Sequence, residues 1–141
     1  MSTRFVIARP NPEDPKRWTG VYGHSDGYPT GAGKLLHAHV VNEFNSDPEA
    51  AARHLIDAHP CGWAFLAEEF AESECYCHDR DEPEAIATET EKGAGGMDWT
   101  YVLRPEGLEV HRWDLGIIAT VPWGQGDADW GLIERTGHAT V

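Results

Sequence analysis

The sequence predicts a single α+β domain over residues 1–141, with a mainly antiparallel sheet and two helices packed on one face. Three observations indicate this class. Short β-favouring runs open the chain, two segments with apolar residues at helical spacing follow, and alternating runs return near the end. The length of 141 residues suits one core, because single domains typically hold about 100–200 residues. An apolar fraction of 40% supplies enough core-forming side chains.

The N-terminal part predicts two strands followed by a helix. RFVIA (4–8) and TGVYGH (19–24) favour strands, and the proline-rich stretch between them predicts a long surface loop. Apolar residues then recur at four-residue spacing, which predicts a helix from about Gly31 to Asn45. The apolar side of this helix carries Leu36, Val40 and Phe44.

The next segment, NSDPEAAARHLIDAHP, predicts a second helix. Ser46 or Asp47 can accept hydrogen bonds from free N–H groups of its first turn, and Glu49 completes an S-x-x-E capping box with Ser46. Because Pro60 cannot continue a helix, the chain is expected to turn at HPCGW. The following run WAFLAEEF fits either a strand or a third short helix, since periodicity does not distinguish them.

The C-terminal part contains the clearest strand signal. WTYVL and LEVHRW alternate in hydrophobicity around the turn RPEG, which predicts a hairpin with Trp99, Tyr101 and Leu103 on one face. LGIIATVPW predicts one more strand, ended by Pro122. The tail GQGDADWGLIERTGHATV is expected to add a short edge strand or to lie loosely on the surface.

Charge and composition narrow the partners and the compartment. The net charge of −13 opposes direct binding to nucleic acid or to an anionic membrane, and favours basic partners or cationic ligands. No run approaches the roughly 20 apolar residues of a membrane span, and the N-terminus lacks a secretory apolar region, which predicts a cytoplasmic protein. The 3 cysteines fit reduced thiols, structural or metal-bound, better than a disulfide framework.

The glycine-rich stretch HSDGYPTGAGK (24–34) departs from both common phosphate-binding patterns. A P-loop would need glycine at Tyr28 and a hydroxyl at Leu35, and the dinucleotide pattern would need glycine at Leu36. A simpler interpretation is that Asp26-Gly27 turns the chain and that Thr30 caps the following helix.

A ligand pocket at this turn is still expected. A helix N-terminus presents free N–H groups and a positive dipole, which suit a small anionic ligand. His24 and Asp26 would flank this point. The candidate ligand-binding residues are His24, Asp26, Gly27, Tyr28, Gly31, Gly33 and Lys34.

A second candidate site lies in ECYCHDRDE, which concentrates residue types that ligate metals. Together with Cys61 from the HPCGW turn, Cys75, Cys77 and His78 form one four-ligand set for zinc. The C-x-C spacing is tighter than the usual C-x2-C, and free cysteines at these positions could instead fill the core. A closed set would be structural, whereas three ligands and a water could support hydrolysis.

The turn motif also carries a resemblance. Strand, His-x-Asp-Gly-Tyr-Pro, glycine and helix together resemble a family of small uncharacterised actinobacterial and actinophage proteins, and IDAHPCGW, ECYCHDRD and DWTYVL extend this likeness over most of the chain. Members often carry tryptophan between the histidine and the aspartate, where this chain has Ser25. The resemblance implies a phage or mobile-element accessory context, and it assigns no reaction.

Two functions follow from these observations. The first is a small acidic binding or accessory protein that captures a host protein or a small anionic ligand at the His24–Gly33 turn. The alternative is a metal-dependent hydrolase or transferase that uses His24 and Asp26 with the Cys/His metal site. The sequence contains no complete catalytic signature, so whether a reaction is catalysed is left open. Trp123 and Trp130, if exposed, would indicate an interface.

Overall fold

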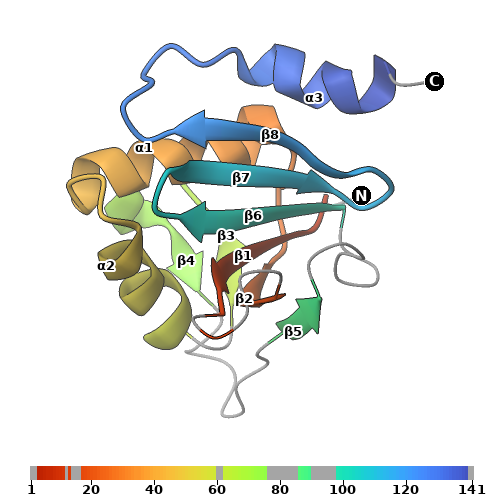
Figure 1. Ribbon diagram of the computed structural model, residues 1–141. Coiled ribbons are helices and arrows are strands. Elements are labelled where there is room, and N and C mark those ends of the chain that lie inside the picture. Colours follow the sequence, from red (N-terminus) through yellow and green to blue (C-terminus); the bar gives the residue numbers. More distant parts are fainter. Residues whose placement is uncertain are drawn as a thin grey trace.

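The chain forms a mixed β-sheet with helices packed against it, as seen in the computed structural model (Figure 1). The structure describes residues 3–11, 13, 17–59, 62–75, 86–89 and 98–139, and it describes only the backbone of 86–89 and 136–139. The strand order is β4-β3-β2-β1-β6-β7-β8, and β5 pairs with β2 beside this path. The α+β class is therefore confirmed.

The centre of the sheet differs from the mainly antiparallel arrangement expected from the sequence. Strands β1 (Phe5–Pro10) and β2 (Arg17–Gly23) pair antiparallel, as a direct return of the chain requires. However, β1 pairs in parallel with β6 (Trp99–Arg104), and β2 pairs in parallel with β3 (Trp63–Phe65). Parallel neighbours need a long crossover, and the helical segment between β2 and β3 supplies one.

Both predicted helices are present, but they begin and end at other residues than the sequence predicted. The first helix starts as the π-helical turn η1 (Pro29–Gly33) and continues as α1 (Lys34–Glu43). The second consists of α2 (Pro48–Ala52) and the π-helical turn η2 (Arg53–Asp57). Asp47 caps α2 by accepting hydrogen bonds from two backbone N–H groups, which settles the choice between the two proposed capping residues.

Short elements complete the sheet. The run left undecided between strand and helix contains β3 and then the 3-10 turn η3 (Phe70–Glu72), and β4 (Glu74–Cys75) pairs antiparallel with β3. β5 (Ile86–Glu89) pairs antiparallel with β2 and is a strand that the sequence did not predict. The predicted hairpin is confirmed as β6 and β7 (Gly107–Arg112), and β8 (Gly116–Pro122) extends it.

The tail forms the helix α3 (Trp130–Ala139), so the expected edge strand or loose segment was wrong. The carboxylate of Asp129 accepts a hydrogen bond from the N–H of Leu132, which satisfies a free donor of the first helical turn. Burial of Trp130 then holds the helix against the body of the protein. Figure 1 shows α3 lying alongside β8.

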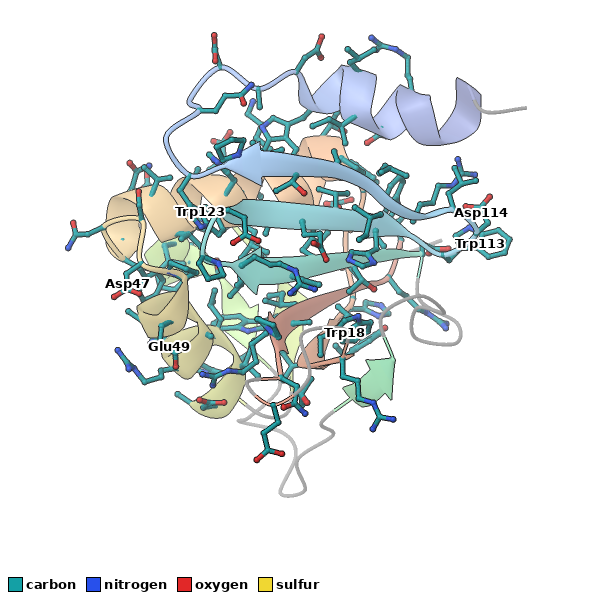
Figure 2. All side chains as sticks on the ribbon, in the orientation of Figure 1. Trp18, Asp47, Glu49, Trp113, Asp114 and Trp123 are labelled. Carbon is teal, nitrogen blue, oxygen red and sulfur yellow. The ribbon has the colours of Figure 1, made fainter. Side chains whose placement is uncertain are left out.

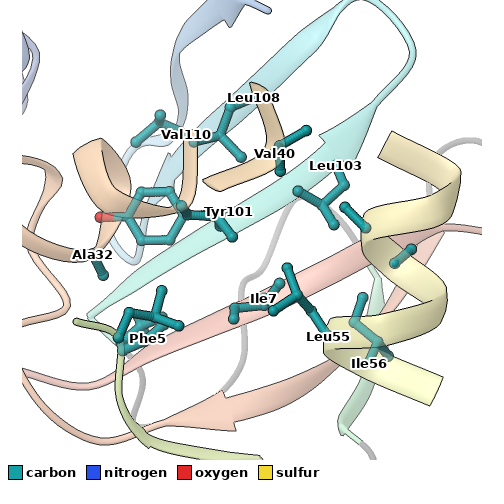
Figure 3. Packing of buried hydrophobic residues seen from close by; sticks show 14 of the residues in the cluster. Phe5, Ile7, Ala32, Val40, Leu55, Ile56, Tyr101, Leu103, Leu108 and Val110 are labelled. Atoms are coloured by element: carbon teal, nitrogen blue, oxygen red, sulfur yellow. The ribbon is translucent and has the colours of Figure 1, made fainter. Parts of the chain in front are cut away.

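The main core lies between the sheet and the helical layer. Trp99, Tyr101 and Leu103 all point into it, which confirms the predicted face of β6. Figure 3 shows Tyr101 reaching from β6 toward Ala32 of η1. A smaller cluster on the opposite face of the sheet consists of Val6, Ala8, Trp18 and Val102. Within the described residues, no helix has the length and apolar character needed to cross a membrane.

Candidate functional site

The predicted turn between β2 and the first helix is held in place by the sheet. Asp26 adopts a positive φ of 55°, a conformation that aspartate and asparagine tolerate better than most residues. The N–H of Gly27 donates to the carbonyl of Thr3 at 2.9 Å. The buried hydroxyl of Tyr101 donates to the carbonyl of Gly27. Asp26-Gly27 therefore turns the chain, as predicted, and two long-range hydrogen bonds fix its position.

The helix that follows begins earlier than predicted, and Thr30 does not cap it. Tyr28 occupies the capping position without a side-chain hydrogen bond, and Pro29 begins the first turn. Thr30 lies inside that turn and donates both its N–H and its hydroxyl to the carboxylate of Glu134, at 3.2 and 2.9 Å. A carboxylate from α3 therefore occupies the anion-binding position that the sequence assigned to a ligand.

The glycines of the turn have a packing explanation. A Cβ atom added at Gly31 would lie 2.4 Å from the carbonyl oxygen of Asp26. One added at Gly33 would lie 3.0 Å from the ring of Tyr101, which packs beneath the helix. Close approach of the backbone to its neighbours thus accounts for both glycines without a bound phosphate.

A hollow of about 130 Å³ lies beside the turn. We call it the turn hollow. Polar groups from the turn and the first helix form one part of its wall, and the side chains of leucines form another. Its lining residues are Ser25, Asp26, Tyr28, Thr30, Gly31, Ala32, Leu35 and Leu66.

The phenol of Tyr28 lies beside a negatively charged side chain at this hollow. The Tyr28 hydroxyl donates to the carboxylate of Asp26 at 3.1 Å. This hydrogen bond and the charge of Asp26 raise the pKa of Tyr28 above its ordinary value, and the charge of Glu134 adds to the effect. Two carboxylates from segments far apart in sequence therefore act on one exposed hydroxyl.

Three of the seven predicted ligand-binding residues line the hollow, namely Asp26, Tyr28 and Gly31. His24 does not line it, because Nδ1 is hydrogen-bonded to the hydroxyl of Tyr22 and the His24 N–H donates to Trp63. Gly27, Gly33 and Lys34 are also outside its lining, although Gly27 and Gly33 shape the adjoining backbone.

The described residues include one of the four proposed zinc ligands. Cys61, Cys77 and His78 lie outside the described residues, while Cys75 is half-buried and packs against the main core. Among the residues that the structure describes, no group of three or more histidine, cysteine or acidic side chains is arranged to hold a metal ion. The Cys/His site stays a prediction.

The histidines of the first helix have structural roles. The Nε2 atom of His37 donates to the carbonyl of Pro122 at 2.8 Å, and its ring lies 5.4 and 5.6 Å from those of Trp123 and Trp130. Both tryptophans are buried, at 6% and 8% exposure, so they provide no interface signal. Similarly, Nε2 of His39 donates to the carbonyl of Ala67 at 2.7 Å.

Sequence reasoning missed a buried ionic network on the opposite face of the sheet. Glu109 accepts from Nε of Arg104 at 2.8 Å and from Nε2 of His111 at 2.7 Å. Desolvation by burial acts to raise the pKa of Glu109, but the hydrogen bonds and positive charges of the two partners outweigh it and lower the pKa. Alternation along the hairpin placed these residues on one face, but it did not indicate that they would be buried.

Comparison with known proteins adds no assignment. No model of a known protein family matches the chain, and no significant match exists among curated proteins or solved structures. The candidate site is therefore defined by its own residues. No local sequence pattern indicated a role for Glu134 at the turn, because this role arises from a contact between residues 104 positions apart.

Proposed function

We propose that the protein is a small acidic binding protein that holds a cationic or hydrogen-bond-donating group in the turn hollow. The observation that carries this proposal is the carboxylate of Asp26 in the wall of the hollow, where it accepts from Tyr28, with the carboxylate of Glu134 held beside it on Thr30. The carboxylate of Asp26 in the wall makes the hollow unfavourable for an anion. Glu134 already accepts the two hydrogen bonds that Thr30 could otherwise donate to an anion. A cationic group is therefore preferred over the small anion first expected.

The size of the hollow indicates the kind of ligand. Pockets that bind whole small molecules typically measure about 300–1,000 Å³. At about 130 Å³, the turn hollow suits one functional group or a single side chain. The alkyl stem of a lysine or arginine could pack against the leucine side chains while its charged end meets the carboxylates. We therefore infer a partner protein that inserts one basic side chain, and we propose a host protein in this role.

Methylguanidinium and butylamine mimic the two basic side chains and provide a direct test. Titration followed by NMR should shift the amides of residues 25–35, and the variants Asp26→Asn and Glu134→Gln should each weaken binding about two- to fivefold. Asparagine tolerates the positive φ at this position, so the turn is retained. Glu106→Gln removes the same charge from an exposed residue of the β6–β7 turn and should leave binding unchanged.

Inorganic phosphate serves as the opposing probe. The proposal requires that phosphate cause no shift at the turn. Binding of phosphate at these amides, or equal binding of methylguanidinium by the wild type and both carboxylate variants, would contradict it.

A further inference from the structure

The turn between β7 and β8 exposes a group of large apolar side chains. Trp113, Leu115 and Ile117 are 62%, 41% and 57% exposed. Elsewhere among the described residues, the large hydrophobic side chains with comparable exposure are those of Phe65 and Leu132. We call residues 113–117 the hairpin tip. Neighbouring exposed apolar side chains are unusual on a soluble domain and commonly mark an interaction surface.

Hydrogen bonds hold the backbone of the hairpin tip. The N–H of Leu115 donates to the carbonyl of Arg112 at 3.2 Å, and Nε of Arg112 contacts the carboxylate of Asp114 at 2.8 Å. The N–H of Trp113 donates to the carbonyl of Asp98 at 3.2 Å. Figure 2 shows Trp113 and Asp114 together at this end of the sheet, with Trp113 directed away from the body. A preorganised backbone loses little conformational entropy on binding.

The hairpin tip and the turn hollow lie at the same end of the sheet. The strand register aligns Gly23, at the end of β2, with Phe5, Trp99, Arg112 and Gly116 in successive strands. Four strand spacings separate the two ends of this row, or about 19 Å. A standard interface covers about 800 Å² on each partner, a patch roughly 30 Å across. One partner can therefore contact both features.

Charge distinguishes a second copy of this chain from a basic partner protein as the occupant of the hairpin tip. Each copy of this chain carries a net charge of −13, so repulsion opposes self-association through the tip. The same field attracts a basic partner. Locally, Arg112 is neutralised by Asp114, and the indole face of Trp113 is the side-chain surface that best accepts a cation.

We propose that the hairpin tip is a docking surface for a basic partner protein, one whose arginine or lysine side chains alternate with apolar side chains. This inference rests on the proposed function, because the same partner would place one basic side chain in the turn hollow. The apolar side chains of the partner pack against Leu115 and Ile117, and a neighbouring cation lies over Trp113.

A short peptide of alternating arginine and leucine is a suitable probe, with alternating glutamate and leucine as its charge control. The basic peptide should bind the full chain and the acidic one should not. The double variant Trp113→Ala/Ile117→Thr changes exposed side chains only, and it should weaken binding of the basic peptide about tenfold or more. Leu132→Ser replaces an exposed side chain outside the tip and should leave affinity within about twofold.

The outcomes separate this inference from the proposed function. The inference is overturned if the tip variant binds the peptide as well as wild type does, or if wild type fails to bind it. It is also overturned if sedimentation shows a wild-type dimer that the tip variant loses, since the occupant is then a second copy. Methylguanidinium binding should be equal in wild type and tip variant. The two proposals can also fail separately. If the tip variant loses peptide binding while methylguanidinium binding is unaffected by Asp26→Asn and Glu134→Gln, the docking surface is upheld and the function proposed for the turn hollow is refuted.

Discussion

The carboxylate of Glu134 accepts two hydrogen bonds from Thr30, one from its N–H at 3.2 Å and one from its hydroxyl at 2.9 Å. This contact joins α3 to the first turn of the helical layer, across 104 positions of sequence. It places a negative charge where the dipole of the first helix favours one. The same carboxylate acts on Tyr28, so the contact connects the C-terminal helix to the turn hollow.

Replacing Glu134 by alanine should loosen α3 without unfolding the domain. The contact is exposed, so its loss should cost only about 0.5–1 kcal/mol. Hydrogen exchange should accelerate about two- to fivefold in the amides of 130–135 and remain unchanged in β6. Thr30→Val removes the hydroxyl donor and should add little to Glu134→Ala in a double-mutant cycle. Fully additive effects of the two substitutions would show that these residues are not coupled.

Tyr101→Phe should weaken the attachment of the turn to the sheet. The Tyr101 hydroxyl is fully buried and donates to the carbonyl of Gly27, so its removal leaves a buried acceptor without this donor. The expected loss in the free energy of unfolding is about 1–2 kcal/mol, measured by urea denaturation. Phe5 packs against the same ring and makes no such hydrogen bond, so Phe5→Leu is a packing control. A stability of Tyr101→Phe equal to wild type would argue against the hydrogen bond.

The protein should lose stability as pH falls below about 6.5, in part because of His39. Burial lowers the pKa of His39, against the opposing effects of its hydrogen bond to Ala67 and the charges of Glu43 and Glu69. The unfolded chain therefore binds a proton more readily than the folded one, so the contribution of His39 is complete above about pH 6.5 and declines as pH drops toward the lowered pKa.

The variant His39→Gln can retain the donor to Ala67 and has no titrating group. Its free energy of unfolding should change less than that of wild type between about pH 7.5 and pH 5.5. Chemical denaturation at several pH values measures this difference. Identical pH dependence in the two proteins would assign the effect to other groups.

Glu109→Gln should be among the most destabilising conservative changes in the hairpin. The side chains of Glu109, Arg104 and His111 are only 10%, 14% and 3% exposed, and the substitution removes the charge that both partners contact. The expected loss is about 3 kcal/mol near neutral pH. Because the pKa of Glu109 is lowered, its contribution persists above about pH 4.3 and is lost as pH falls through the lowered value. The gap between variant and wild type should therefore shrink in acid, and a constant gap would refute the ionic role.

The exposed tryptophan that indicates an interface is Trp113, and not Trp123 or Trp130, which the sequence suggested. Trp123 and Trp130 enclose His37, whereas Trp113 is 62% exposed at the hairpin tip. Composition and local pattern do not distinguish these residues, because each tryptophan lies beside polar or turn-forming residues. Exposure depends on whether another segment packs over the side chain, and in this protein His37 of α1 packs against both Trp123 and Trp130.

Sequence patterns predicted the order of most elements, the α+β class, the face of β6 that enters the core and the Asp26-Gly27 turn, because these depend on periodicity and on residue-specific backbone preferences. The three-dimensional fold was needed to reveal the parallel pairing of β1 with β6, the docking of α3 and the contact of Glu134 with Thr30. These features join segments far apart in the chain, and long-range contacts form through packing and mutual burial, for which a local pattern carries no signal.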